Sequence, residues 1–181
     1  MYSLTLQLNA RLQPLDRGDI YEDYIIEVLE ENGVGSIDGG GTLLQENGEV
    51  EYCDIEITLE EGNEESIEFL LEVIEAIQVP KGSLLYNEDV KYEVGTLEGL
   101  ALYMNGTDLP DEVYRNCDIN VVIEKLEELL EDSGEYYSYW EGPQDTALYF
   151  YGDSYEKMKK IMEPFLREYP LCQKCRVVQI A

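Results

Sequence analysis

Histidine is absent from this sequence of 181 residues, and positively charged residues are scarce. The chain has 12 lysines and arginines against 40 aspartates and glutamates, which gives a formal net charge of -28. The missing histidine removes the side chain that most often acts as a general base or metal ligand near neutral pH. The excess negative charge opposes binding to nucleic acids and to anionic membranes, because both carry charge of the same sign. A basic protein would instead be attracted by forces that weaken as salt rises.

Long apolar runs are also missing, since no segment approaches the ~18 residues that a membrane-spanning helix needs. The first five residues, Met1 to Thr5, lack the basic start and apolar core of a signal peptide. We therefore expect a cytoplasmic protein with no membrane partner. Apolar residues nevertheless make up 44% of the chain, which is enough to build a core in one domain or two small ones.

Cysteine is too rare to form a disulfide framework, with four residues in the chain. Cys172 and Cys175 form one C-x-x-C pair near the end, while Cys53 and Cys117 stand alone. A structural zinc site usually needs two such pairs or added histidines. We therefore expect reduced, partly buried thiols, no bound metal and no cofactor.

Basic residues are distributed unevenly along the chain. Between Gly18 and Pro80 there is no lysine or arginine, yet the same stretch carries nineteen acidic residues. A surface that serves solubility alone would intersperse both signs of charge. This stretch is therefore predicted to form an anionic face.

The first half of the chain has the pattern of four strands and two helices. Strands are predicted at residues 4–8, 35–44, 49–59 and 83–86, the middle two joined by the turn signal Gln45-Glu46-Asn47-Gly48. One helix is predicted from Asp19, with a capping-box spacing to Glu22 and with Gly33 as its end. A second helix is predicted from Glu64.

The second half repeats this order of elements. Strands are predicted at residues 99–105, 135–141, 146–151 and 176–180. Asp118 is placed to cap one helix, which Gly134 ends, and Asp153 is placed to cap the other. Pro164 should kink or divide that last helix.

The resulting order, β-α-β-β-α-β twice, is the split βαβ arrangement of ferredoxin-like folds. We therefore predict an α+β fold of two tandem ferredoxin-like units that pack together. The first, acidic unit spans residues 1–87, and the second, tyrosine-rich unit spans residues 91–181.

Two segments have compositions that suggest ligand binding. The glycine-rich segment 38–42 lacks the lysine and the following helix of a phosphate-binding loop, so we interpret it as a bulged or bent strand. Aromatic residues crowd the predicted strands at 135–141 and 146–151, an arrangement typical of RNA-recognition modules. The basic surround of such modules is missing, so we expect a core face and a protein-contact face instead.

Acidic side chains gather on one strand and on the outer faces of the helices. Asp54 and Glu56 share a strand face, with Glu49 and Glu51 before them. Such carboxylates can hold a metal ion or transfer protons, but nothing singles out a reacting pair, so an exposed charged face is the simpler interpretation. We predict no catalytic residues. The candidate partner-binding residues are Asp54, Glu56, Glu64, Glu65 and Glu68.

Four stretches carry a resemblance to a known family that goes beyond their composition. They are residues 4–14, 51–57, 138–143 and 169–175. Together they resemble the small acidic anti-CRISPR inhibitors of Cas9 carried by mobile elements of gut bacteria. The resemblance implies an inhibitor that binds a basic nucleic-acid-handling enzyme, Cas9 or its guide RNA complex, and impairs its hold on DNA. It implies no particular functional residues.

The charge of the chain agrees with this expectation. Cas9 holds its nucleic acids in positively charged channels, and an anionic protein is attracted by the same lysines and arginines. We expect inhibition of the use of target DNA, without enzymatic activity and without direct binding to free DNA. Two alternatives remain open. One is an immunity protein that neutralises a basic nuclease toxin by the same electrostatics, and the other is a carboxylate-based metal-dependent enzyme.

Overall fold

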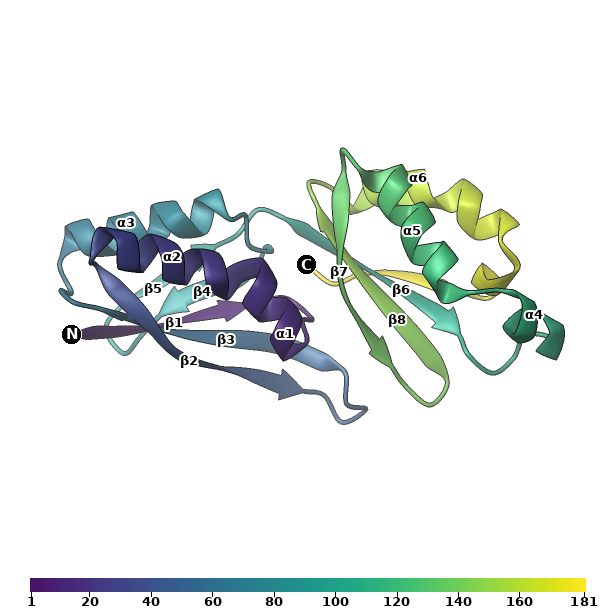
Figure 1. Ribbon diagram of the computed structural model, residues 1–181, viewed down its shortest axis with the longest axis horizontal. Helices are drawn as coiled ribbons and strands as arrows, with labels where there is room; N and C mark the ends of the chain where they lie inside the picture. The colour runs from purple at the N-terminus through teal and green to yellow at the C-terminus, as the bar shows by residue number, and fades with distance from the viewer. The chain divides into compact units, whose positions relative to one another are not determined.

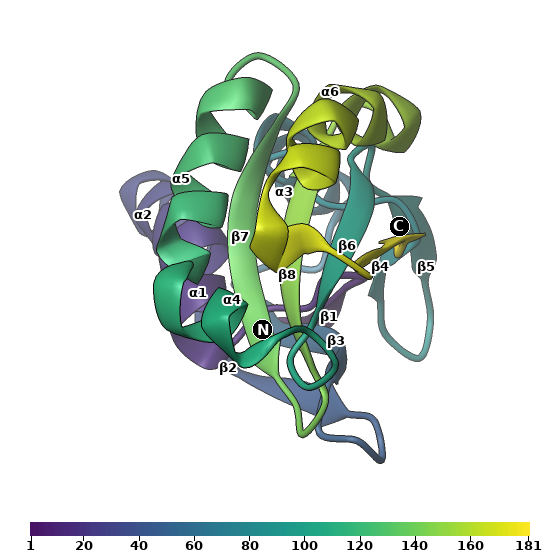
Figure 2. The ribbon, with the colours of Figure 1, turned by 90° about the vertical axis from the view of Figure 1, so that its right-hand side faces the viewer.

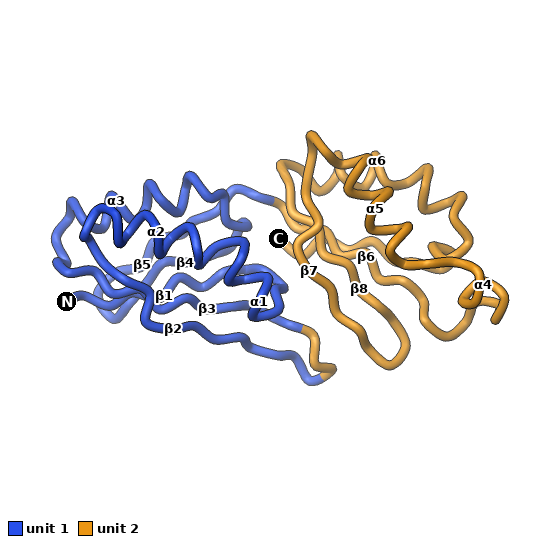
Figure 3. The backbone as a smooth tube through the Cα atoms, in the orientation of Figure 1, with its two compact units in different colours: residues 1–46, 50–97 blue, residues 47–49, 98–181 orange.

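The structure, a computed structural model, describes all residues from Met1 to Ala181 and divides into two compact units (Figure 3). Unit 1 comprises Met1–Glu46 and Val50–Leu97, and unit 2 comprises Asn47–Glu49 and Glu98–Ala181. No helix in the chain combines the length and the apolar character that crossing a membrane requires.

Unit 1 is built on a five-stranded antiparallel sheet with the order β2-β3-β1-β4-β5 (Figure 1). The strands are β1 (Tyr2–Leu8), β2 (Gly35–Leu44), β3 (Val50–Leu59), β4 (Ser83–Tyr86) and β5 (Lys91–Val94). Strands β1 to β4 lie at the predicted positions, within two residues at each end. Strand β5 was not predicted, and it pairs with β4 as a hairpin, so unit 1 continues past the expected boundary near Asn87 to Leu97.

The helices of unit 1 are α1 (Pro14–Arg17), α2 (Asp23–Asn32) and α3 (Glu64–Ala76), with a π-helical turn at Gly18–Glu22 between the first two. The prediction of a helix start at Asp19 is wrong. Helical structure begins at Pro14, because proline lacks the N–H that a first helical residue leaves unpaired, and its ring presets the helical φ. The end at Gly33 is confirmed, and that residue adopts the left-handed φ of 63° that glycine tolerates.

Alternation along the strands separates a buried face from a polar face. The buried side chains of β1 and β3 meet those of α2 and α3, which lie on one side of the sheet (Figure 1). This core contains Leu4, Leu6, Leu8, Ile25, Leu29, Cys53, Ile55, Ile57, Leu59, Ile67, Leu70, Ile74 and Leu85. No helix of unit 1 covers the other side, here called the open face, which the register assigns to Ser3, Thr5, Gln7, Gly39, Gly41, Tyr52, Asp54, Glu56, Thr58, Leu84 and Tyr86.

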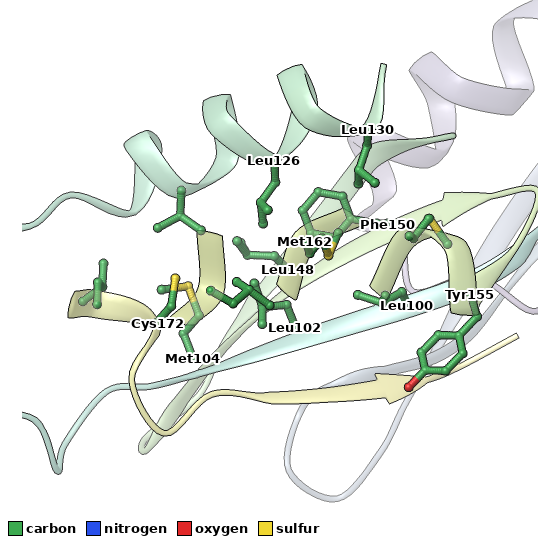
Figure 4. Packing of buried hydrophobic residues seen from close by; sticks show 14 of the residues in the cluster. Leu100, Leu102, Met104, Leu126, Leu130, Leu148, Phe150, Tyr155, Met162 and Cys172 are labelled. Atoms are coloured by element: carbon green, nitrogen blue, oxygen red, sulfur yellow. The ribbon is translucent and has the colours of Figure 1, made fainter. Parts of the chain in front are cut away.

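Unit 2 is built on a four-stranded antiparallel sheet with the order β7-β8-β6-β9. The strands are β6 (Glu98–Asn105), β7 (Gly134–Glu141), β8 (Asp145–Gly152) and β9 (Arg176–Gln179). Its helices α5 (Ile119–Leu130) and α6 (Tyr155–Glu168) lie on the same side of the sheet (Figure 2), and a short helix α4 (Asp111–Asn116) precedes α5. Figure 4 shows their core, in which Leu102 and Phe150 from the sheet meet Leu126 and Met162 from the helices.

Two local predictions for unit 2 need correction. The N-cap of α6 is Ser154, whose hydroxyl accepts the N–H of Lys157, and not Asp153. Pro164 lies inside α6 and does not divide it, while the kink at this residue stays a prediction. Gly134 is the first residue of β7, since α5 already ends at Leu130. The cap at Asp118 is confirmed, because its carboxylate accepts the N–H of Asn120.

The strand orders establish the fold class. In each unit the first strand lies at the centre between the third and fourth strands, and the second strand lies at an edge. That order is the ferredoxin-like arrangement, with β5 as an addition in unit 1. The prediction of two tandem ferredoxin-like units is confirmed.

Candidate protein-binding surface

Negative charge is concentrated in unit 1. This unit has 22 acidic and four basic residues, a net charge of -18, while unit 2 has 18 acidic and eight basic residues, a net charge of -10. The more acidic unit is the one predicted from the stretch without lysine or arginine. An excess of this size can steer a basic partner toward unit 1.

One of the four basic residues of unit 1, Arg17, is buried and forms hydrogen bonds inside the fold. The residue is 8% exposed, and its Nε donates to Glu22 Oε1 at 2.5 Å. Its Nη1 donates to the Gly41 carbonyl at 2.8 Å and to Thr42 Oγ1 at 3.2 Å. Arg17 therefore neutralises little of the surface charge and instead ties the first helical segment to β2.

The glycine-rich segment of β2 makes room for Arg17. The register of β2 on β3 shifts between Ile37 and Gly39, which confirms the predicted bulge. A Cβ atom at Gly40 would lie 2.9 Å from Arg17 Nη2 and 2.6 Å from the Asp54 carbonyl oxygen. Gly40 is thus required by the close approach of the guanidinium group.

The neighbouring glycines lie on the open face beside the two predicted carboxylates. Gly41 pairs with Asp54 and Gly39 with Glu56. A Cβ atom at Gly41 would meet nothing within 4 Å, and one at Gly39 would meet only Glu56 Oε2, at 3.7 Å. The glycines therefore leave space on the β2 side of both carboxylates.

Asp54 is held in place by its neighbour on β1, because Gln7 Nε2 donates to Asp54 Oδ1 at 3.3 Å. Tyr86 lies opposite Thr5 on the same face. Partial burial, together with the nearby Asp54 and Tyr52, raises the pKa of Tyr86 above its ordinary value. The open face thus combines a carboxylate held by a hydrogen bond, that of Asp54, with tyrosine rings.

A hollow of about 600 Å³ lies at the end of this face where the chain begins. Its lining includes Thr5 and Tyr86, and its acidic members are Asp38, Glu56, Glu88 and Asp89. Four carboxylates around one hollow favour a positively charged group over an anion or an apolar one.

The other predicted partner-binding residues belong to α3. Glu64 and Glu65 form its first turn, and Glu68 follows. All three are exposed and make no ion pair with lysine or arginine. Because α3 covers the buried side of the sheet, the structure does not bring these residues together with Asp54 and Glu56. The five predicted residues form two surfaces rather than one.

Glu49, expected on the same charged strand face, is instead buried within unit 2 at 3% exposure. Its Oε1 accepts the hydroxyl of Tyr103 at 2.5 Å and that of Tyr149 at 2.8 Å. No local pattern predicts this burial, because the two tyrosines follow 54 and 100 residues later in the chain.

The aromatic strands of unit 2 expose less ring surface than the alternation predicts. Tyr149, Phe150 and Tyr151 are all buried, because both faces of β8 are covered. A register shift between Tyr136 and Ser138 also breaks the alternation along β7. Tyr139, at 50% exposure, is the one aromatic residue of these strands that is largely accessible.

All four cysteines are free, as predicted, with two buried and two partly buried. Burial in the core of unit 2, with the thiols of Cys175 and Cys117 nearby, raises the pKa of Cys172 to about 12. Burial also raises the pKa of Cys53. These thiols therefore stay protonated at neutral pH and are poor nucleophiles. No group of three or more cysteine, aspartate or glutamate side chains is arranged to hold a metal ion.

No model of a known protein family matches the chain. A search of curated proteins finds no match either. Among solved structures, the chain is similar to the first two RRM domains of the yeast poly(U)-binding protein Pub1, at 13% identity. The match covers 99% of each chain with a TM-score of 0.27. The ferredoxin-like assignment rests on the strand orders, and no function is transferred from this likeness.

Proposed function

We propose that this chain is an acidic protein inhibitor that binds a basic nucleic-acid-handling enzyme in the cytoplasm. The proposed target is Cas9 or its guide RNA complex, and the proposed effect is weaker use of target DNA. The observation that carries the proposal is the net charge of -18 on unit 1, with Arg17 buried inside the fold. The resemblance of four sequence stretches to anti-CRISPR inhibitors supports the choice of target.

The proposed mechanism is competition for cationic surface. Lysines and arginines that contact DNA phosphates in the enzyme would be attracted by the carboxylates of unit 1. The association rate should rise with the opposite charges of the two proteins and fall with salt, as for other electrostatically steered complexes. Free DNA would be repelled, so the inhibitor acts on the enzyme and not on its substrate.

Binding rather than catalysis is also supported by the titratable groups. Burial raises the pKa values of Cys53, Tyr86, Cys172 and Cys175 above their ordinary values. An upward shift keeps thiols and phenols neutral at pH 7, which is the inactive form of a nucleophile.

The test is a cleavage assay with purified Cas9, guide RNA and target DNA. The protein is added either before or after the DNA, and the fraction cleaved is measured over time. We expect reduced cleavage, with a larger reduction when the protein is added first, and weaker binding to the enzyme as salt rises. Full cleavage at a large excess of the protein, across several Cas9 variants, would contradict the proposal. A basic nuclease toxin, sought by pull-down from the native host, would then become the leading target.

A further inference from the structure

We propose that the partner binds to the open face of unit 1 and not to the acidic row of α3. On this view, the occupant is an exposed segment of a basic protein, whose arginine and lysine side chains contact Asp54, Glu56 and the acidic hollow. This inference rests on the proposed function for the kind of partner, and it adds the surface and the groups that are recognised.

Charge complementarity favours this face. Across the open face and its hollow, the acidic residues are Asp38, Asp54, Glu56, Glu88, Asp89 and Glu93. Lys91, on the edge strand opposite Tyr86, is the one lysine or arginine that the register adds to this side. Neither Asp54 nor Glu56 forms an ion pair, so both carboxylates are available to a cationic partner.

The spare space beside the carboxylates is the second observation. Glycine in the interior of a strand destabilises a fold, because its chain is the most flexible and it has no side chain to pack. Gly40 is explained by Arg17, but no contact within unit 1 requires glycine at position 39 or 41. The two glycines leave open space beside Asp54 and Glu56, here called the recess, and a side chain from a partner can enter it.

The tyrosines indicate which cation fits. The register places Tyr52, Asp54 and Tyr86 on the open face. Partial burial, with Asp54 and Tyr52 nearby, raises the pKa of Tyr86. A guanidinium group can pair with a carboxylate through two hydrogen bonds while its plane rests on an aromatic ring. Arginine therefore uses more of this surface than lysine does.

The acidic row of α3 lacks these features. Glu64, Glu65 and Glu68 are exposed on α3, and none of them lines the acidic hollow. Flexible glutamates of this kind lose side-chain entropy when they pair, and exposed pairs are weak. The helix contributes to long-range attraction, whereas the open face makes the contacts.

The test compares variants that are matched in charge. Asp54→Asn with Glu56→Gln removes two charges from the open face, and Glu64→Gln with Glu68→Gln removes two from α3. Binding to the Cas9–guide RNA complex is followed by surface plasmon resonance at low salt, with thermal unfolding as a check on folding. We expect the affinity of the open-face pair to fall by about tenfold or more, and that of the helix pair by less than about threefold.

A steric variant separates contact from charge. Gly39→Thr with Gly41→Thr fills the recess, keeps every carboxylate and suits a strand, so folding should be retained. The matched control is Gly18→Ala, where a Cβ atom also meets nothing within 4 Å. We expect the threonine pair to raise the dissociation rate by about tenfold and Gly18→Ala to leave it unchanged. An equal or larger loss in the α3 variant, or no loss in the threonine pair, would overturn the inference.

A second experiment tests the binding surface without depending on the identity of the target. A peptide of nine arginines is titrated into the ¹⁵N-labelled wild-type chain, and amide shifts are mapped. Shifts confined to β1, β3, β4 and the Asn87–Asp89 loop support the open face, even if Cas9 itself does not bind. Shifts centred on α3, or the same open-face shifts with a uridine homopolymer, would overturn it.

Discussion

Arg17 offers the sharpest test of how unit 1 is held together. Its guanidinium group makes three hydrogen bonds, to Glu22, to the Gly41 carbonyl and to Thr42. Arg17→Leu removes all three while filling part of the same volume. The carbonyl of Gly41 would lose a charged donor, and the Glu22 carboxylate, with 21% of its side chain exposed, would lose its counter-charge.

The cost follows from these contacts. Each hydrogen bond to a charged group contributes about 1.5–3 kcal/mol, and breaking a buried ion pair costs about 3–5 kcal/mol. The Glu22 side chain reaches solvent, which reduces its penalty, and the new leucine recovers some apolar burial. We therefore expect Arg17→Leu to lower the free energy of unfolding by about 2–4 kcal/mol. Arg17→Lys should cost about half as much, because a single ammonium group cannot span the three acceptors.

The assay is urea unfolding followed by far-ultraviolet circular dichroism. Glu27→Gln, on the exposed side of α2, serves as a control that removes one charge without a partner, and it should change the free energy of unfolding by less than about 0.5 kcal/mol. Gly40→Ala should destabilise by about 1–3 kcal/mol, because its Cβ atom overlaps the guanidinium group and the Asp54 carbonyl. A change below about 0.5 kcal/mol for Arg17→Leu would refute this account of the β2 attachment.

Three further predictions concern unit 2. The pKa of Cys172 is about 12 when folded, against an ordinary value of 9.0, so the unfolded chain loses this proton first. The stabilisation from this protonated thiol is therefore complete below pH 9 and is lost towards pH 12. In urea unfolding across this range, the free energy of unfolding of Cys172→Ala should decline less than that of the wild type. Ser154→Ala should cost about 1 kcal/mol in thermal unfolding and Asp153→Ala much less, whereas the reverse order would show that the cap is misplaced. Native mass spectrometry after growth with added zinc should show the metal-free chain, and a stoichiometric zinc lost on Cys175→Ser, together with loss of folding, would contradict this expectation.

The order of elements could be predicted from the sequence because it depends on neighbours within one strand or helix. Leu4, Leu6 and Leu8 alternate with polar residues, and that period is enough to define a half-buried strand. The turn at Asn47-Gly48 and the glycine after α2 are equally local signals. Repetition of this order in both halves predicted the ferredoxin-like fold. The charge of each unit is likewise a property of the sequence.

Other features depend on residues that are distant in the chain, and local patterns did not reveal them. Strand β5 is too short and too polar to be recognised without its partner β4. In the sequence, Glu49 has the pattern of an exposed strand glutamate. In the structure, its carboxylate accepts hydrogen bonds from two tyrosines, one on β6 and one on β8.

The candidate surface shows the same division. The sequence identified acidic residues on a strand and on the following helix, since alternation and helical period each predict an outward side. It could not show that these outward sides point away from each other, with a sheet between them. The antiparallel register also decided that Gly39 and Gly41 lie beside Glu56 and Asp54, and that Gly40 faces Arg17. Sequence determined how much charge the chain carries, and tertiary structure decided which carboxylates share a surface, because that depends on how strands pair across the sheet.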